Sequence, residues 1–225
     1  MKRRIIAALA ILVIVSGLAL RGAFYAHSMS SDATVQLYPL HAAAVHFPDR
    51  IDALVAGGVS PDVLNDAGLT PLQTAVAHRK QLGAATLLAL GADPNIGNAA
   101  GNSMLAQAAM WGDLHTVRLL LNFGADVNAE YQTRAALHHA IVHDHGEIVD
   151  LLLEQPGINL DLQSTATGYT PLHLAVQHER NEIIERLLAM HADPGIRDHV
   201  GNTPQDLAKH KSDTSLATLL DTPQE

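Results

Sequence analysis

The eleven residues GLTPLQTAVAH at positions 68–78 return almost unchanged as GYTPLHLAVQH at positions 168–178. In both copies a Thr precedes a Pro, and an apolar run follows. A Thr hydroxyl can cap the first free amides of a helix, and Pro is favoured at the first helical position. Each copy therefore predicts a helix that begins just after Thr70 or Thr170.

The same start recurs through the chain with a fixed period. Gly58, Gly91 and Gly124 open turn motifs that lie 33 residues apart, and HADPG at 191–195 continues the series. One helix pair cannot bury its own apolar face, so a period of this length predicts pairs that stack into a solenoid. The predicted helix starts are PLH (39–41), TPL (70–72), SML (103–105), AALH (135–138), TPLH (170–173) and TPQD (203–206).

Small residues recur at one position of the first helix, where they would let stacked helices approach closely; these are Ala75, Ala108, Ala140 and Ala175. The second helix carries paired leucines such as Leu119–Leu120 and Leu151–Leu152. Gly91 and Gly124 are expected to end their helices in a left-handed turn.

The segment TPLHLAV followed by an E-I-I-x-x-L-L pattern and ADP, at 170–194, resembles the ankyrin repeat, and so does SMLAQAAMWGDLHTVRLLLNFGADVNA at 103–129. The resemblance covers residues 37–221 and implies an all-α solenoid of about six helix-pair repeats with short β-hairpin loops. Some copies depart from the pattern. HFPDR (46–50) makes repeat one irregular, AEYQTRAAL lacks the turn glycine, and TPQDLAKHKSDTSLATLLD at 203–221 is typical of a polar C-terminal cap.

The N-terminus predicts export. MKRR is followed by an uncharged apolar run of sixteen residues, 5–20, and by Arg21. This layout is typical of a hydrophobic helix that acts as a signal anchor or a cleaved signal peptide, here assigned to residues 1–26, with a polar linker at 27–36. Either alternative places the repeats outside the inner membrane, in the periplasm of a Gram-negative bacterium, with membrane contact only through this segment.

The charge of the remaining chain limits its partners. Residues 1–21 hold four of the 14 Lys and Arg, so 10 remain against 23 Asp and Glu, a formal net charge of −13. Such a domain repels nucleic acid and anionic lipid, and it attracts a basic, exported protein partner. The chain has no cysteine, which excludes disulfides, thiolate metal sites and a cysteine nucleophile.

Resemblance to ankyrin arrays implies a protein-binding module whose concave side is built from hairpin tips and first helices. The two variable positions near the end of each first helix are expected to face that side. Trp111 beside Met110 has the composition of a binding hot spot, although Trp111 could instead pack on the neighbouring helix. The predicted partner-binding residues at these positions are Val45, His46, His78, Met110, Trp111, Val142, His143, Gln177 and His178.

Tyr131 and Tyr169 at the hairpin tips are further predicted contacts, because Tyr offers a large contact area at low entropic cost. Each ring could equally cover its own neighbour.

The chain contains 14 histidines, yet no metal site or cofactor is predicted. Stacked helices lie about 8–10 Å apart, too far for neighbouring column members to share a zinc ion. His139 and His143 share a helix face in LHHAIVHDHGE (137–147), but His139 replaces a core leucine. His41, His138 and His173 occupy the TPLH position, which in this family bridges backbone groups of adjacent repeats.

Motifs of common enzyme classes, including G-x-S-x-G, H-E-x-x-H and the P-loop, are absent, so we expect no catalysis. The predicted function is a scaffold or assembly factor for another exported protein. Two alternatives stay open: an immunity protein that neutralises an exported toxin enzyme, and a histidine-based sensor of metal or pH whose partner affinity changes between about pH 5 and 8.

Overall fold

The computed structural model describes residues 38–97, 101–210 and 220. Within them, five helix pairs follow one another and a further first helix closes the series. The first helices are α3 (Pro39–His46), α5 (Pro71–Ala77), α7 (Met104–Met110), α9 (Ala136–Val142), α11 (Pro171–Gln177) and α13 (Pro204–His210). The second helices are α4 (Ile51–Ala56), preceded by the 3₁₀ turn η1 (Pro48–Arg50), α6 (Gln81–Ala89), α8 (Leu114–Asn122), α10 (Gly146–Leu153) and α12 (Asn181–Ala189).

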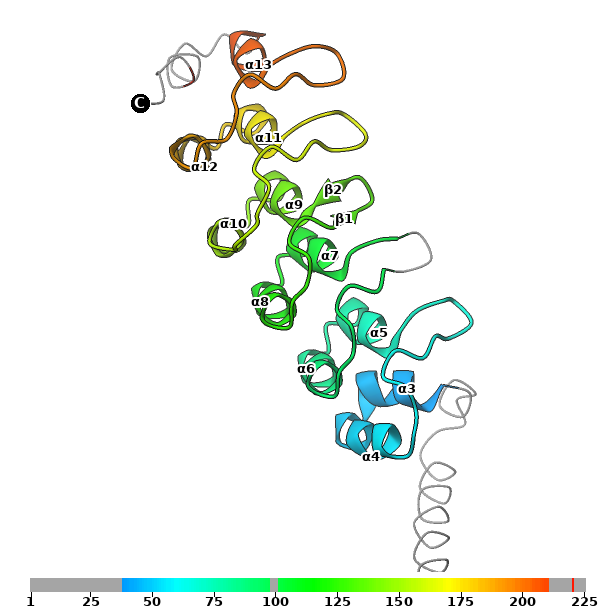
Figure 1. The fold of residues 1–225 in the computed structure, drawn as a ribbon. Coiled ribbons are helices and arrows are strands. Elements are labelled where there is room, and N and C mark those ends of the chain that lie inside the picture. The colour runs from blue at the N-terminus through cyan, green and yellow to red at the C-terminus, as the bar shows by residue number, and fades with distance from the viewer. Residues whose placement is uncertain (1–37, 98–100, 211–219, 221–225) are drawn as a thin grey trace, which may run out of the picture.

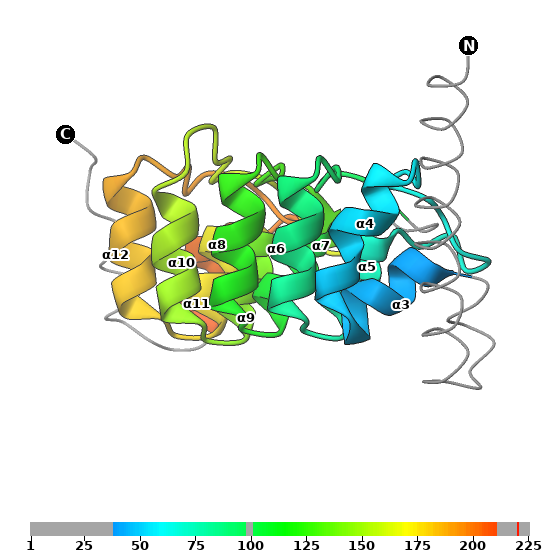
Figure 2. The ribbon, with the colours of Figure 1, turned by 90° about the horizontal axis from the view of Figure 1, so that it is seen from below.

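The helices form two layers. The first helices stack along one side of the solenoid and the second helices along the other, as Figure 1 shows end-on and Figure 2 shows from below. The loops between repeats project beyond the layer of first helices. The predicted all-α solenoid of helix pairs is therefore confirmed. The proposed signal (1–26), the linker (27–36) and residues 211–219 of the expected C-terminal cap lie outside the described residues.

Local capping explains where the first helices begin. The Thr70 hydroxyl accepts a hydrogen bond from the backbone N–H of Gln73 at 3.1 Å, and the Gln73 side chain accepts one from the N–H of Thr70 at 2.8 Å. Thr170 and His173 form the equivalent reciprocal box. Ser103 caps α7 with its hydroxyl alone. The predicted Thr-Pro starts are confirmed.

Only one of the described interrepeat loops forms a regular hairpin. Strand β1 (Glu130–Tyr131) pairs antiparallel with β2 (Arg134–Ala135), inside the segment that lacks the turn glycine. Gln132 takes the left-handed conformation there, at φ +62°. Other loops are closed by a few backbone bonds without forming strands; for example, the N–H of Asn65 bonds to the carbonyl of Leu69 at 3.0 Å and the N–H of Gly68 to that of Asn65 at 2.8 Å.

The core lies between the two helix layers and runs the length of the solenoid. The recurring alanines are fully buried, as predicted: Ala75, Ala108, Ala140 and Ala175. Each is flanked by a fully buried leucine from the start of the same helix, namely Leu72, Leu105, Leu137 and Leu172. Because alanine keeps the contact thin, successive first helices pack against each other directly.

Polar side chains also tie the turns of adjacent repeats together. Asp62 accepts a hydrogen bond from the backbone N–H of Asp93 at 3.0 Å, and Asn95 accepts one from that of Asp126 at 2.8 Å. Asn128 and Asp161 repeat the contact one period later each. These four acceptors are spaced 33 residues apart in the sequence, a signal that sequence analysis missed.

The predicted membrane segment lies in the N-terminal residues that the structure does not describe. None of the helices in the described ranges is both long enough and apolar enough to cross a bilayer. The apolar run at 5–20 lies outside these ranges, so the expected signal or anchor stays a prediction.

Candidate functional site

The predicted binding column lies where each first helix ends. In repeats two to five, one member of each pair is the last helical residue and the next is the C-cap; the C-caps are His78, Trp111, His143 and His178. His46 is the last residue of α3. The first helices stack in one row along the solenoid (Figure 1), so the ends of these helices follow one another along it.

The structure leaves every member of this column at least partly accessible. His46, His78, His143 and Gln177 are exposed, and the half-buried members are Val45, Met110, Trp111, Val142 and His178. None of these side chains is fully buried. The column therefore offers a continuous row of imidazole, aliphatic and indole surface to another molecule.

Trp111 does not stand alone in this row. The guanidinium carbon of Arg79 lies 5.5 Å from the centre of the indole ring, and its Nη2 donates weakly to the Trp111 carbonyl at 3.5 Å. This cation–π contact holds both side chains in place at the surface. Sequence analysis missed Arg79. Its signal was a departure from the family pattern, which has glycine at this position, as the chain itself has at Gly112.

The two tyrosines are held by histidines of the same repeats. The Tyr169 ring stacks on His173 with centres 5.4 Å apart, and the Tyr131 ring meets His139 edge-on at 6.0 Å. Both tyrosines are half-buried. A partner could therefore reach only part of each ring.

The TPLH histidines bridge adjacent repeats, as the resemblance implied. Nε2 of His41 lies 2.8 Å from the Leu69 carbonyl, that of His138 lies 2.9 Å from Leu162, and that of His173 lies 3.1 Å from Asn202. In repeat two the amide of Gln73 makes the same contact, donating to the carbonyl of Ile96 at 2.8 Å.

Burial lowers the pKa of these histidines. Desolvation lowers the pKa of His138 to about 4, against opposing hydrogen bonds to the carbonyls of Leu162 and Tyr169. The same cause lowers the pKa of His41 and of His173. Each imidazole is therefore neutral near pH 7 and donates from Nε2. These residues hold the fold together and are not surface contacts.

The cluster in LHHAIVHDHGE makes separate contacts with the protein. His139 is buried and bonds through Nε2 to the Tyr131 carbonyl at 3.0 Å, while its Nδ1 has no partner. His145 approaches the Met110 carbonyl at 3.3 Å. His143 stacks between them, with ring centres 6.3 Å and 6.0 Å away. In the described part of the chain, no three His, Cys, Asp or Glu residues are placed to hold a metal ion.

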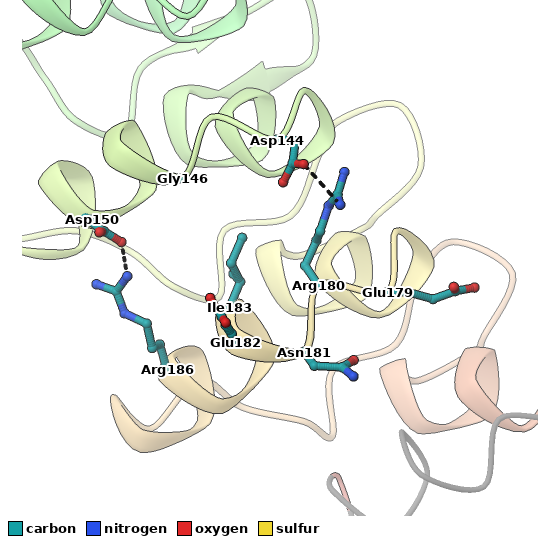
Figure 3. Close-up of a pocket in the computed structure, with 9 residues that line it drawn as sticks. All are labelled: Asp144, Gly146, Asp150, Glu179, Arg180, Asn181, Glu182, Ile183 and Arg186. Carbon is teal, nitrogen blue, oxygen red and sulfur yellow. Dashed lines mark hydrogen bonds and ion pairs between the residues drawn. The ribbon is translucent and has the colours of Figure 1, made fainter.

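A crevice of about 430 Å³ opens between repeats four and five, beside the loop that joins α9 to α10 (Figure 3). Two ion pairs cross it: Arg180 to Asp144 at 3.2 Å, and Arg186 to Asp150. Gly146 lines the crevice without a side chain, whereas the equivalent residue of repeat five is Asn181. Both arginines already have carboxylate partners, and Glu179 and Glu182 also line the crevice, so its formal charge is negative.

Comparison with known proteins agrees with this architecture. The family model for ankyrin repeats in three copies matches residues 82–164 and 105–198. The mouse B-cell lymphoma 3 protein homolog is 31% identical over 180 residues, which are 77% of this chain and 40% of that protein. Human Rabankyrin-5 is 43% identical over 72 residues, 32% of this chain and 6% of that protein. The chain thus spans less than half the length of these relatives.

Solved structures show the same fold. The crystal structure of the ankyrin repeat domain of Bcl-3 superposes with a TM-score of 0.71 and 26% identity, covering 81% of this chain and 84% of that one. An ankyrin repeat domain from Acinetobacter baumannii gives a TM-score of 0.73 and 27% identity, with 81% and 96% covered. With its helix pairs, bridging histidines and matched repeats, the chain belongs to the ankyrin-repeat family.

Proposed function

We propose that this protein is a scaffold or assembly factor that holds another exported protein against its concave surface, on the periplasmic side of the inner membrane. Ankyrin repeats are protein-interaction modules, and that much follows from the family. The finer role rests on the accessible column of first-helix ends, centred on Trp111 and Met110. Export rests on the basic start and the apolar run at 5–20.

Trp111 is the residue on which this proposal depends most. An indole that is half-buried, fixed by Arg79 and placed in the third of five complete repeats can contribute a large apolar area at low entropic cost. The acidic charge of the domain would speed the approach of a basic partner without specifying the contact.

A cross-linking experiment tests both the surface and the compartment. Spheroplasts that produce the full chain are treated with a membrane-impermeant amine cross-linker, and the adducts of the native chain are compared with those of Trp111→Ala. We expect one specific adduct, and we expect it to weaken at least about thirtyfold in the variant, the equivalent of about 2 kcal/mol.

Phe123→Ala is the matched control, because Phe123 is an exposed aromatic residue at the end of α8, outside the column. It should leave the adduct unchanged. An adduct insensitive to Trp111→Ala contradicts the proposed surface, and adducts that form only after the inner membrane is broken contradict export.

A further inference from the structure

A second crevice, of about 220 Å³, lies between repeats one and two. Its apolar wall includes Val45, Pro48 and Leu82, and Leu82 is 67% exposed. Arg79 and Lys80 complete the rim. No carboxylate is among the residues that line it, although the domain carries a formal net charge of −13 outside residues 1–21.

This crevice is the counterpart of the one between repeats four and five, 100 residues earlier in the sequence. Glu179 there replaces Arg79, Arg180 replaces Lys80, and Glu182 replaces Leu82. The later crevice is polar and crossed by ion pairs (Figure 3), whereas the earlier one combines two cations with exposed aliphatic surface. The cationic character therefore comes from the side chains and is not a property of the fold.

Repeat register explains why the two cations lack a partner. Arg180 reaches back to Asp144 of the preceding repeat, and His145 packs over Gly112 in the same manner, so that a Cβ at Gly112 would lie 2.6 Å from the imidazole. Lys80 is the counterpart of Arg180 in repeat two. The residue of repeat one that corresponds to Asp144 is Phe47, which has no charge. Among the described residues, neither Arg79 nor Lys80 forms an ion pair.

Arg79 also has an unfavourable backbone. Its φ is +54°, in the left-handed region that favours glycine. The equivalent residues Gly112, Asp144 and Glu179 are left-handed as well, so this conformation belongs to the repeat and does not by itself mark a site. One N–H of the guanidinium forms a long hydrogen bond with the Trp111 carbonyl, so its other N–H groups can bind another acceptor. A glycine would relieve the strain but would remove the cation from the rim.

From this arrangement we infer that the crevice between repeats one and two receives a protein segment in which a carboxylate neighbours an aliphatic side chain. The carboxylate lies between Arg79 and Lys80, and the aliphatic group packs on Leu82 and Val45. The inference rests on the proposed protein-binding function and specifies the chemistry of the segment that contacts it. A protein segment is favoured over an anionic bilayer, because one carboxylate fits the crevice while an extended anionic surface is repelled by the acidic domain.

Trp111 provides the measurement, since it is the only tryptophan in the chain and Arg79 stacks on it. The full-length chain is titrated with short peptides in which Leu alternates with Glu, with Gln or with Lys, and the fluorescence of Trp111 is followed. We expect the Glu peptide to bind roughly fivefold or more tightly than the Gln peptide, and the Lys peptide to bind most weakly.

Charge variants then locate the contact. Arg79→Gln and Lys80→Gln should each weaken the Glu peptide by up to about fivefold, while Arg118→Gln, an equal loss of charge on the outer helix α8, should have no effect. Arg79→Glu should shift the preference toward the Lys peptide. The backbone accommodates this change, because Glu179 occupies the equivalent position at φ +57°.

Three results overturn the inference: a Lys peptide that binds as tightly as the Glu peptide, an unchanged Glu response in the Arg79→Gln, Lys80→Gln double variant, or a Trp111 response to phosphatidylglycerol vesicles without one to the Glu peptide. None of these alters the cross-linking result with Trp111→Ala. Loss of that adduct with no effect of the charge variants retains the proposed function and rejects only the acidic segment.

Discussion

In several repeats the residue that follows the second helix has a left-handed backbone conformation. Glycine adopts this conformation without strain, whereas another residue at this position is strained. Gly58, Gly91 and Gly124 have φ of +96°, +89° and +81°. In repeat five the same position holds His191 at φ +63°. Its side chain is exposed, and only its backbone N–H is bonded, to the carbonyl of Leu188 at 2.9 Å. The imidazole therefore offers no visible compensation for the strain.

Replacing His191 with glycine is expected to stabilise the protein. A non-glycine residue in the left-handed region costs roughly 1–2 kcal/mol, and the greater freedom of glycine in the unfolded chain offsets part of the gain. We expect the free energy of unfolding to rise by about 0.5–1 kcal/mol in urea denaturation. His191→Ala keeps the strain and removes the imidazole, so it should give no gain. Equal stabilisation by both variants would show that the side chain, not the backbone, is unfavourable.

At the scale of elements, close approach of helices α6 and α3 depends on one missing side chain. Gly83 lies on the buried face of α6, where a Cβ would overlap the carbonyl oxygen of Ala44. Glycine is otherwise unfavourable inside a helix by about 1 kcal/mol. Its presence here is explained by the close packing of repeats one and two. Gly83 and Ala44 also line the crevice between these repeats.

The same substitution at two helical glycines should therefore have opposite effects. Gly83→Ala forces the two helices apart and should lower the free energy of unfolding by roughly 1–3 kcal/mol, as overpacked cores do. At Gly146, in the first turn of α10, a Cβ would meet nothing within 4 Å. Gly146→Ala should be neutral or stabilising by up to about 1 kcal/mol. Comparable losses at both sites, measured by urea denaturation, would refute the packing explanation.

The helices and their order could be predicted because each signal is local and repeated. Thr70 and Thr170 cap their own helices, and the recurring alanines mark the face on which each first helix packs against its neighbours. The surface was harder to predict. Arg79 contacts Trp111 of the next repeat, and Lys80 has Phe47 at the position where its counterpart Arg180 has Asp144 of the preceding repeat. Both facts combine residues of different repeats, so no single repeat pattern contains them.

Across the whole molecule, adjacent repeats are joined by two polar systems. Side chains at the TPLH position bridge to the next repeat near the start of the first helices, and the Asp and Asn series does so at the turns. A repeat in such an array gains much of its stability from its neighbours. A change that weakens one bridge therefore acts on the unfolding of the array and not only on one repeat.

Acid should lower the stability of the array before it protonates ordinary carboxylates, because the histidines of the unfolded chain take up protons first. The folded pKa of His138 is lowered to about 4 from 6.5, so the unfolded chain binds more protons than the folded chain between these values. The free energy of unfolding therefore falls as the pH falls from about 6.5 to 4, and His138 alone contributes on the order of 3 kcal/mol to this loss. His41, His139 and His173, whose pKa values are also lowered by burial, act in the same direction.

The chain supplies its own control for this prediction. Gln73 makes the same bridge in repeat two with an amide that does not titrate. His138→Gln should therefore keep a donor for the Leu162 carbonyl near pH 7 and should flatten the stability curve between pH 6.5 and 4. Urea denaturation at a series of pH values measures both curves. If the two curves run parallel, proton uptake by His138 does not cause the loss of stability between pH 6.5 and 4. That loss would then come from the other buried histidines, whose Nε2 atoms bond to carbonyls in the same way.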